Sequence, residues 1–142
     1  FRRFWAQLIE RSTTRTQLLA NRTTTTDHWL SAGIGRVGFN LSVSLTKDEA
    51  QVECYIRVPG DESKSTMAFE ALRSRQAEIE QKFGGPLEWH DLPGRQGCRI
   101  CTHLPGSWKS PEPEWLAIQD RMIDALIRLD GALRQPIQAL TI

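Results

Sequence analysis

Long apolar runs are missing from this sequence, which nowhere has about 18 consecutive apolar residues. A transmembrane helix needs roughly 20 such residues, so we expect no contact with a membrane. The first residues also lack the apolar segment of a secretory signal peptide. Because the chain begins at Phe1 and not at Met, we expect it to be a piece of a longer protein.

Cysteine is also scarce, with only Cys54, Cys98 and Cys101 among 142 residues. An odd number of cysteines in a domain of this size does not suit a framework of disulfides. We therefore expect reduced thiols and a cytoplasmic location.

The net charge is small, at +1, but it is unevenly distributed. Residues 1–36 carry six arginines against Glu10 and Asp27, which gives +4 and leaves −3 for the rest of the chain. These arginines are Arg2, Arg3, Arg11, Arg15, Arg22 and Arg36. A basic segment can bind nucleic-acid phosphates, and it can equally be a solvent-exposed surface.

The composition, with 39% hydrophobic and 25% charged residues, is that of a globular protein. The length fits one domain over residues 1–142. We divide it into a helical, Arg- and Thr-rich N-terminal region, residues 1–36, and a core of sheet and helix, residues 37–135. The first region should hold a helix over residues 1–11 and a turn at 27–30 capped by Asp27.

Apolar and polar residues alternate over 37–45 and 50–58, which predicts a β-hairpin. Three-four spacing predicts one helix from Ser63 or Ser65 to Phe83, and residues 87–91 and 98–104 predict two more strands. A last helix should span 113–133, with Pro136 preventing its continuation. The order α-β-β-α-β-β-α predicts an α+β two-layer sandwich, in which a four-stranded antiparallel sheet packs its helices on one face.

The last helix has an unusually broad apolar stripe, which indicates packing on two sides. One side should meet the sheet. The other should meet either the N-terminal helix or a second copy of the protein, so we expect self-association or a protein partner.

Gly33-x-Gly35-x-x-Gly38 has the spacing of a dinucleotide-binding loop. Such a loop must follow a strand and open a helix, whereas this one leads into a strand. We therefore exclude dinucleotide binding. The weaker hypothesis is an anion or ligand site formed by Gly33, Gly35 and Arg36 together with Arg22.

The sheet face opposite the helices should be polar and open, and it provides a second candidate site. Its candidate binding residues are Tyr55, Arg57, His90, Arg99 and His103. Such a face can bind a partner or remain solvated. A single aromatic residue gives little support to stacking of nucleic-acid bases.

Cys98-x-x-Cys101 resembles half of a zinc knuckle, but residues three apart on a strand point to opposite faces. We therefore predict no metal and no cofactor. No nucleophile and base form a recognisable pair, so we name no catalytic residue and expect no activity from the domain alone. A metal-dependent enzyme using Cys101, His103 and His90 is kept as a third hypothesis.

Four segments carry a family resemblance: Phe4-Trp5, Trp29 to Gly33 leading to Gly35-Arg36, Pro86 to Trp89, and Trp115-x-x-Ile118-Gln119-Asp120-x-Met122-Ile123-Asp124. Together they resemble a bacterial domain of unknown function, family 4268. The resemblance implies the C-terminal part of a larger bacterial protein, in some cases with a nuclease-like N-terminal domain, and it supplies no site residues. We expect a non-catalytic accessory domain that binds a protein partner. The alternative is a nucleic-acid-binding domain that uses the basic N-terminal third and the Gly-rich loop.

Overall fold

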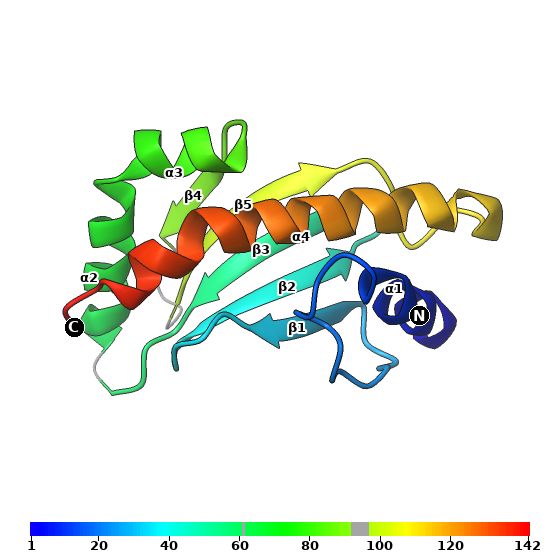
Figure 1. Cartoon of the computed structure of the whole chain (residues 1–142), viewed down its shortest axis with the longest axis horizontal. Coiled ribbons are helices and arrows are strands. Elements are labelled where there is room, and N and C mark those ends of the chain that lie inside the picture. Colours follow the sequence, from blue (N-terminus) through cyan, green and yellow to red (C-terminus); the bar gives the residue numbers. More distant parts are fainter. Residues whose placement is uncertain (61, 92–96) are drawn as a thin grey trace.

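The computed structural model describes residues 1–60, 62–91 and 97–142. The helices are α1 (Arg2–Ser12), α2 (Glu62–Arg73), α3 (Gln76–Phe83) and α4 (Trp115–Gln138), and a short 3-10 helix, η1 (Glu112–Glu114), precedes α4. The strands are β1 (Trp29–Gly33), β2 (Phe39–Leu45), β3 (Ala50–Ile56), β4 (Glu88–Asp91) and β5 (Cys98–Leu104). The α+β class is confirmed (Figure 1).

The sheet has five strands and not the predicted four. Its order is β1-β2-β3-β5-β4, and every neighbouring pair is antiparallel. The additional strand is β1, where we expected a turn: Trp29 pairs with Ser44 and Gly33 with Asn40. Five residues are too short for a clear alternating pattern, and pairing along the edge of β2 determines their conformation.

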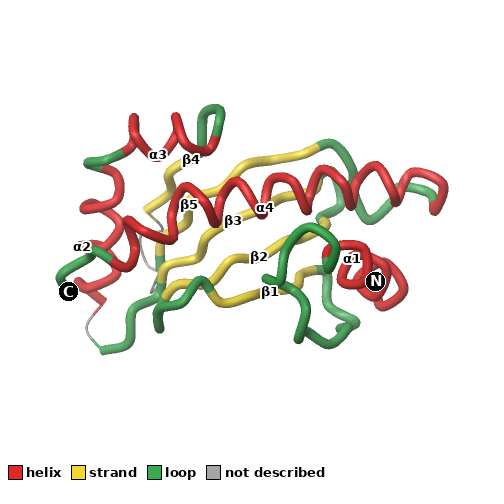
Figure 2. The backbone as a smooth tube through the Cα atoms, in the orientation of Figure 1, coloured by secondary structure: helices red, strands yellow, loops and turns green. Residues whose placement is uncertain are grey.

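Helix α4 crosses one face of the sheet, and the main core lies between them (Figures 1 and 2). Alternate strand residues such as Leu41, Val52 and Ile100 point into this core and are buried. On α4, the buried stripe includes Met122 and Leu129. The strands present their apolar side to α4 because their apolar residues recur every second position.

Most of the broad stripe of α4 is covered within the chain, although Leu116 at its start stays 49% exposed. Besides β2, β3 and β5, the helix packs against α1 and α3. Phe4, Trp5 and Leu8 of α1 are buried there, and so is Ile79 of α3. We expected either the N-terminal helix or a second copy of the protein to pack on this stripe, and the structure shows the N-terminal helix there.

Two predicted helix boundaries were wrong. The helix expected to end at Phe83 is two helices, because the backbone leaves helical geometry at Arg75, where φ is −107° and ψ is 22°. The last helix continues through Pro136 to Gln138. Pro136 and Ile137 are buried, and contacts made by this last turn outweigh the local cost of proline in a helix.

No helix in the described part of the chain has both the length and the apolar character needed to cross a bilayer.

Candidate binding face of the sheet

The face of the sheet turned away from α4, here called the open face, carries the polar side chains. Strand register places them in three rows across the sheet. The rows are Trp29–Ser44–Gln51–His103, Ser31–Ser42–Glu53–Cys101–Glu88 and Gly33–Asn40–Tyr55–Arg99–His90. The predicted polar face is therefore present, and β1 extends it.

The open face contains a hollow of about 430 Å³. Residues of β1, β2, β3 and β5 and of the adjoining loops line it: His28, Trp29, Ser31, Asn40, Ser42, Ser44, Thr46, Gln51, Glu53, Tyr55 and Arg99. Gln51 and Ser44 are only 8% exposed although they lie on this face. The hollow thus brings Tyr55 and Arg99, two predicted site residues, together with an exposed tryptophan, Trp29.

Burial shapes the electrostatics of the hollow. Desolvation raises the pKa of the Glu53 carboxyl, while the guanidinium of Arg99 and a hydrogen bond from Gln51 oppose that rise. Gln51 Nε2 donates to Glu53 Oε1 over 2.9 Å. Within the described residues, Nε of Arg99 is buried without a hydrogen-bond partner. The hollow therefore holds a partly desolvated acid and a buried donor that no described protein group satisfies.

The Tyr55 side chain lies close to the backbone at Gly97. A Cβ atom built on Gly97 would lie 2.4 Å from the Tyr55 hydroxyl oxygen and 2.9 Å from the carbonyl oxygen of Ile56. Only glycine fits at position 97 without moving these atoms. Arg57, also predicted for this site, is exposed just beyond the end of β3, outside the hollow.

His90 and His103 belong to a second group on the open face, beside β4. His103 Nε2 lies 3.0 Å from Glu88 Oε2, and His103 Nδ1 lies 2.9 Å from Glu49 Oε1. His90 Nε2 lies 3.1 Å from the other oxygen of Glu88. Cys101 is fully buried behind them, and burial, with a further contribution from Glu88, raises the pKa of its thiol to about 12.

The Gly-rich stretch is the loop of the β1–β2 hairpin. Gly35 and Gly38 have φ values of 90° and 97°, and β2 begins directly after them, at Phe39. The loop joins two strands and opens no helix, which confirms that it lacks the geometry of a dinucleotide site. Arg36 Nη1 donates to the carbonyl oxygens of Ile137 and Leu140, so this guanidinium is engaged with the end of α4.

Arg22 and Gly33, the other two residues of the predicted anion site, line a different hollow of about 640 Å³. It lies between the segment after α1 and the last part of α4, where Arg134 contributes a second guanidinium. Arg134 is paired with Asp130 at 2.8 Å, whereas Arg22 makes no ion pair with any described residue. Of the residues predicted for the anion site, Arg22 and Gly33 therefore line one hollow, whereas the side chain of Arg36 contacts the end of α4.

The positive charge of the N-terminal region is partly matched by acids on or just before α4. The ion pairs are Arg3–Glu112, Arg11–Asp120 at 2.5 Å and Arg15–Asp124 at 3.6 Å. These acids lie outside residues 1–36, so the count of +4 overstates the charge that this region offers to phosphates.

Trp29 and Ser31 of the open face, with His28 beside them, were missed by sequence reasoning, as was the contact of Glu49 with His103. In the structure Leu30 and Ala32 are buried while Trp29 is exposed, as expected of a strand, but five residues give too short a sequence pattern to predict it. Nothing local could reveal the Glu49 contact, because it depends on the pairing of β3 with β5.

Comparison with known proteins identifies a family. The model of a family described as Domain of unknown function (DUF4268) matches residues 2–137, in agreement with the resemblance carried by the sequence motifs. No curated protein matches, and no solved structure does.

Proposed function

We propose a function from the open face alone, because the chain belongs to the DUF4268 family and the description of that family names no activity. The domain is a non-catalytic binding domain whose open face holds a basic segment of a protein partner. The observation that carries this proposal is the hollow of about 430 Å³, which is lined by a partly desolvated acid and two aromatic side chains.

The side chains of the hollow are of the types that carry binding energy in protein interfaces. Tryptophan, tyrosine and arginine dominate such contacts, and Trp29, Tyr55 and Arg99 all line the hollow. Glu53 lies among them, and Glu49 and Glu88 lie beside it around His103. Three carboxylates close to one guanidinium favour a basic partner over a phosphate backbone.

The family resemblance supplies the proposed context. We place the domain in the cytoplasm of a bacterium, in a larger protein with a nuclease-like module that provides the basic segment. A second copy is a weaker choice of partner, since most of the apolar stripe of α4 is already buried against the sheet, α1 and α3.

Backbone NMR during titration with a short lysine-rich peptide tests this proposal. We expect shifts at Ser42, Gln51 and Tyr55 that disappear in Glu53→Gln, since that substitution removes the negative charge in the hollow. Glu70→Gln, on the exposed side of α2, is the matched control and should bind as the wild type does. A titration that leaves the open-face amides unmoved overturns the proposal.

The 640 Å³ hollow favours a second candidate, nucleic-acid binding, because Arg22 faces it without an ion-pair partner among the described residues. A phosphate held there would make affinity fall steeply with salt. Binding of a short DNA duplex at two salt concentrations, for the wild type and Arg22→Ala, tests this candidate. Equal affinity of the two proteins removes it.

A further inference from the structure

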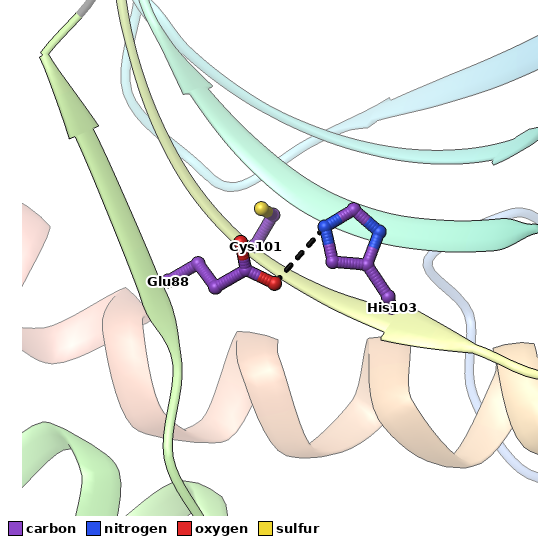
Figure 3. A group of neighbouring side chains, drawn as sticks. All are labelled: Glu88, Cys101 and His103. Atoms are coloured by element: carbon purple, nitrogen blue, oxygen red, sulfur yellow. Dashed lines mark ion pairs between the residues drawn. The ribbon is translucent and has the colours of Figure 1, made fainter.

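We propose that Glu88, Cys101 and His103 form a binding site for a zinc ion on the open face, beside the hollow proposed above to bind a peptide. Cys101 and His103 are two residues apart on β5 and so share this face, and Glu88 lies opposite Cys101 on β4. One potential ligand atom from each residue lies within 4.8 Å of the other two. Figure 3 shows the Glu88 side chain reaching from β4 toward Cys101 and His103 of β5, with a dashed line that marks its contact with the His103 ring.

The three donors are those that zinc prefers. A thiolate, an imidazole nitrogen and a carboxylate oxygen bind zinc at about 2.0–2.3 Å, which separates neighbouring donors by roughly 3.3–3.6 Å in a tetrahedron. His103 Nε2 and Glu88 Oε2, at 3.0 Å, are within a few tenths of an ångström of that separation. Binding replaces the thiol proton of Cys101, which leaves to solvent as the zinc–sulfur bond forms.

The surrounding groups provide a second, independent observation. Zinc-binding histidines donate their other ring N–H to a carboxylate, and zinc-binding carboxylates are themselves hydrogen-bonded. Glu49 Oε1 lies 2.9 Å from His103 Nδ1, which leaves Nε2 directed at Glu88. His90 Nε2 lies 3.1 Å from the second oxygen of Glu88. Both supporting contacts of a zinc site are thus already in place.

Exposure provides a route for the ion. The side chains of His103 and Glu88 are 32% and 48% exposed, whereas Cys101 is buried beneath them. An ion arriving from solvent meets the imidazole and carboxylate first and the sulfur last. Three protein ligands leave one coordination position for water or for a donor of a bound molecule.

The competing explanation is a metal-free ion-pair network, in which a protonated His103 bridges Glu49 and Glu88. The two explanations differ in what the sulfur does, because the ion-pair network makes no use of Cys101. A probe that reports on the Cys101 sulfur therefore separates them.

Cobalt titration of the whole 142-residue domain supplies that probe, since Co²⁺ takes the place of Zn²⁺ and a thiolate ligand gives it an intense near-ultraviolet charge-transfer band. We expect one Co²⁺ per chain with this band and its displacement by Zn²⁺. Cys101→Ser should abolish the band, while Cys98→Ser, whose sulfur lies on the other face, should keep it. Circular dichroism of each metal-free variant confirms that it is folded.

Glu49→Gln tests the positioning of His103, because glutamine still fills the space but accepts the ring N–H less strongly. We expect zinc affinity to fall about 10- to 100-fold with the charge-transfer band retained. The absence of a charge-transfer band in the wild type, or its equal loss in Cys98→Ser, overturns the proposal. Failure of the peptide titration leaves this result unaffected, since no peptide is used here.

Discussion

Arg36 and Ile137 are 101 residues apart in the sequence, yet the Nη1 atom of Arg36 lies 2.8 Å from the carbonyl oxygen of Ile137. The same nitrogen lies 2.8 Å from the carbonyl oxygen of Leu140. The loop between β1 and β2 thereby donates two hydrogen bonds to carbonyl groups at and just beyond the C-terminal end of α4. This arrangement gives the arginine of the Gly-rich loop a structural role.

Replacing Arg36 with alanine should lower the free energy of unfolding by about 1.5–3 kcal/mol, the range for hydrogen bonds made by a charged group. Urea unfolding measures this change. Arg22→Ala is the matched control and should stay within about 0.5 kcal/mol of the wild type, since Arg22 has no ion-pair partner among the described residues. Equal effects of the two substitutions would show that the contacts with α4 contribute nothing.

Glu80 should make the free energy of unfolding depend on pH. Its carboxylate accepts hydrogen bonds from the backbone N–H of Leu87 at 2.9 Å and from the indole of Trp89 at 3.1 Å, and these, led by Leu87, lower its pKa from the ordinary 4.5. Because the pKa of Glu80 is lower in the folded than in the unfolded state, its carboxylate stabilises the fold at pH values above the unfolded-state pKa. This stabilisation is lost as the pH falls through the folded-state pKa. Glu80→Gln should therefore be less stable than the wild type near neutral pH, with the gap closing below pH 4.5.

Urea unfolding at several pH values measures this gap, and Glu70→Gln on α2 serves as the control, with no gap to close. A gap for Glu80→Gln that stays constant with pH contradicts the role assigned to its charge.

Gly97→Ala should destabilise the domain by about 1–3 kcal/mol, the usual cost of forcing a group into a filled space. The new methyl group would meet the Tyr55 hydroxyl and the carbonyl oxygen of Ile56. Thermal or urea unfolding measures the effect, and combining the substitution with Tyr55→Ala should recover part of it. Gly131→Ala is the control: it is exposed on α4 with open space around it, and the fold should gain about 0.5–1 kcal/mol. No loss in Gly97→Ala contradicts the close approach.

All three thiols should be unreactive toward a bulky aromatic disulfide such as DTNB while the protein is folded. Cys54, Cys98 and Cys101 are buried. Burial also raises the pKa of Cys54 to about 12, so this residue stays in the protonated thiol form, which reacts weakly. In denaturant, three thiols per chain should react quickly. One thiol that reacts at once in the folded state would contradict the buried positions.

The sequence predicted those parts of the fold in which local pattern and tertiary structure agree. Alternation identified β2, β3 and β5 and the side of the sheet on which Tyr55 and Arg99 lie. Alternation did not reveal β1, which is too short to show a period. The helix boundary expected at Pro136 was also wrong, because long-range contacts override the local tendency of proline to end a helix. The general rule that proline ends helices gave the wrong boundary because Arg36 and the core hold that turn.

The candidate site, too, could be predicted only in part from the sequence. Cys98 and Cys101 were correctly expected on opposite faces, since that follows from strand geometry alone. The neighbours of His103 could not be predicted, because Glu49 and Glu88 reach it only through the pairing of three strands. Sequence spacing reveals contacts along a strand but not the order in which strands assemble.

The position of α4 in the chain has a consequence during synthesis. All five strands precede it, and 34 residues (138 − 104) separate the end of β5 from the end of α4. At about 5–20 residues per second, a ribosome needs roughly 2–7 s to make them. Throughout that time the apolar side of the sheet lacks its main cover, and α1 lacks the surface on which it docks. The nascent chain therefore cannot complete its core until α4 has been made, and we expect its uncovered sheet to be prone to aggregation until then.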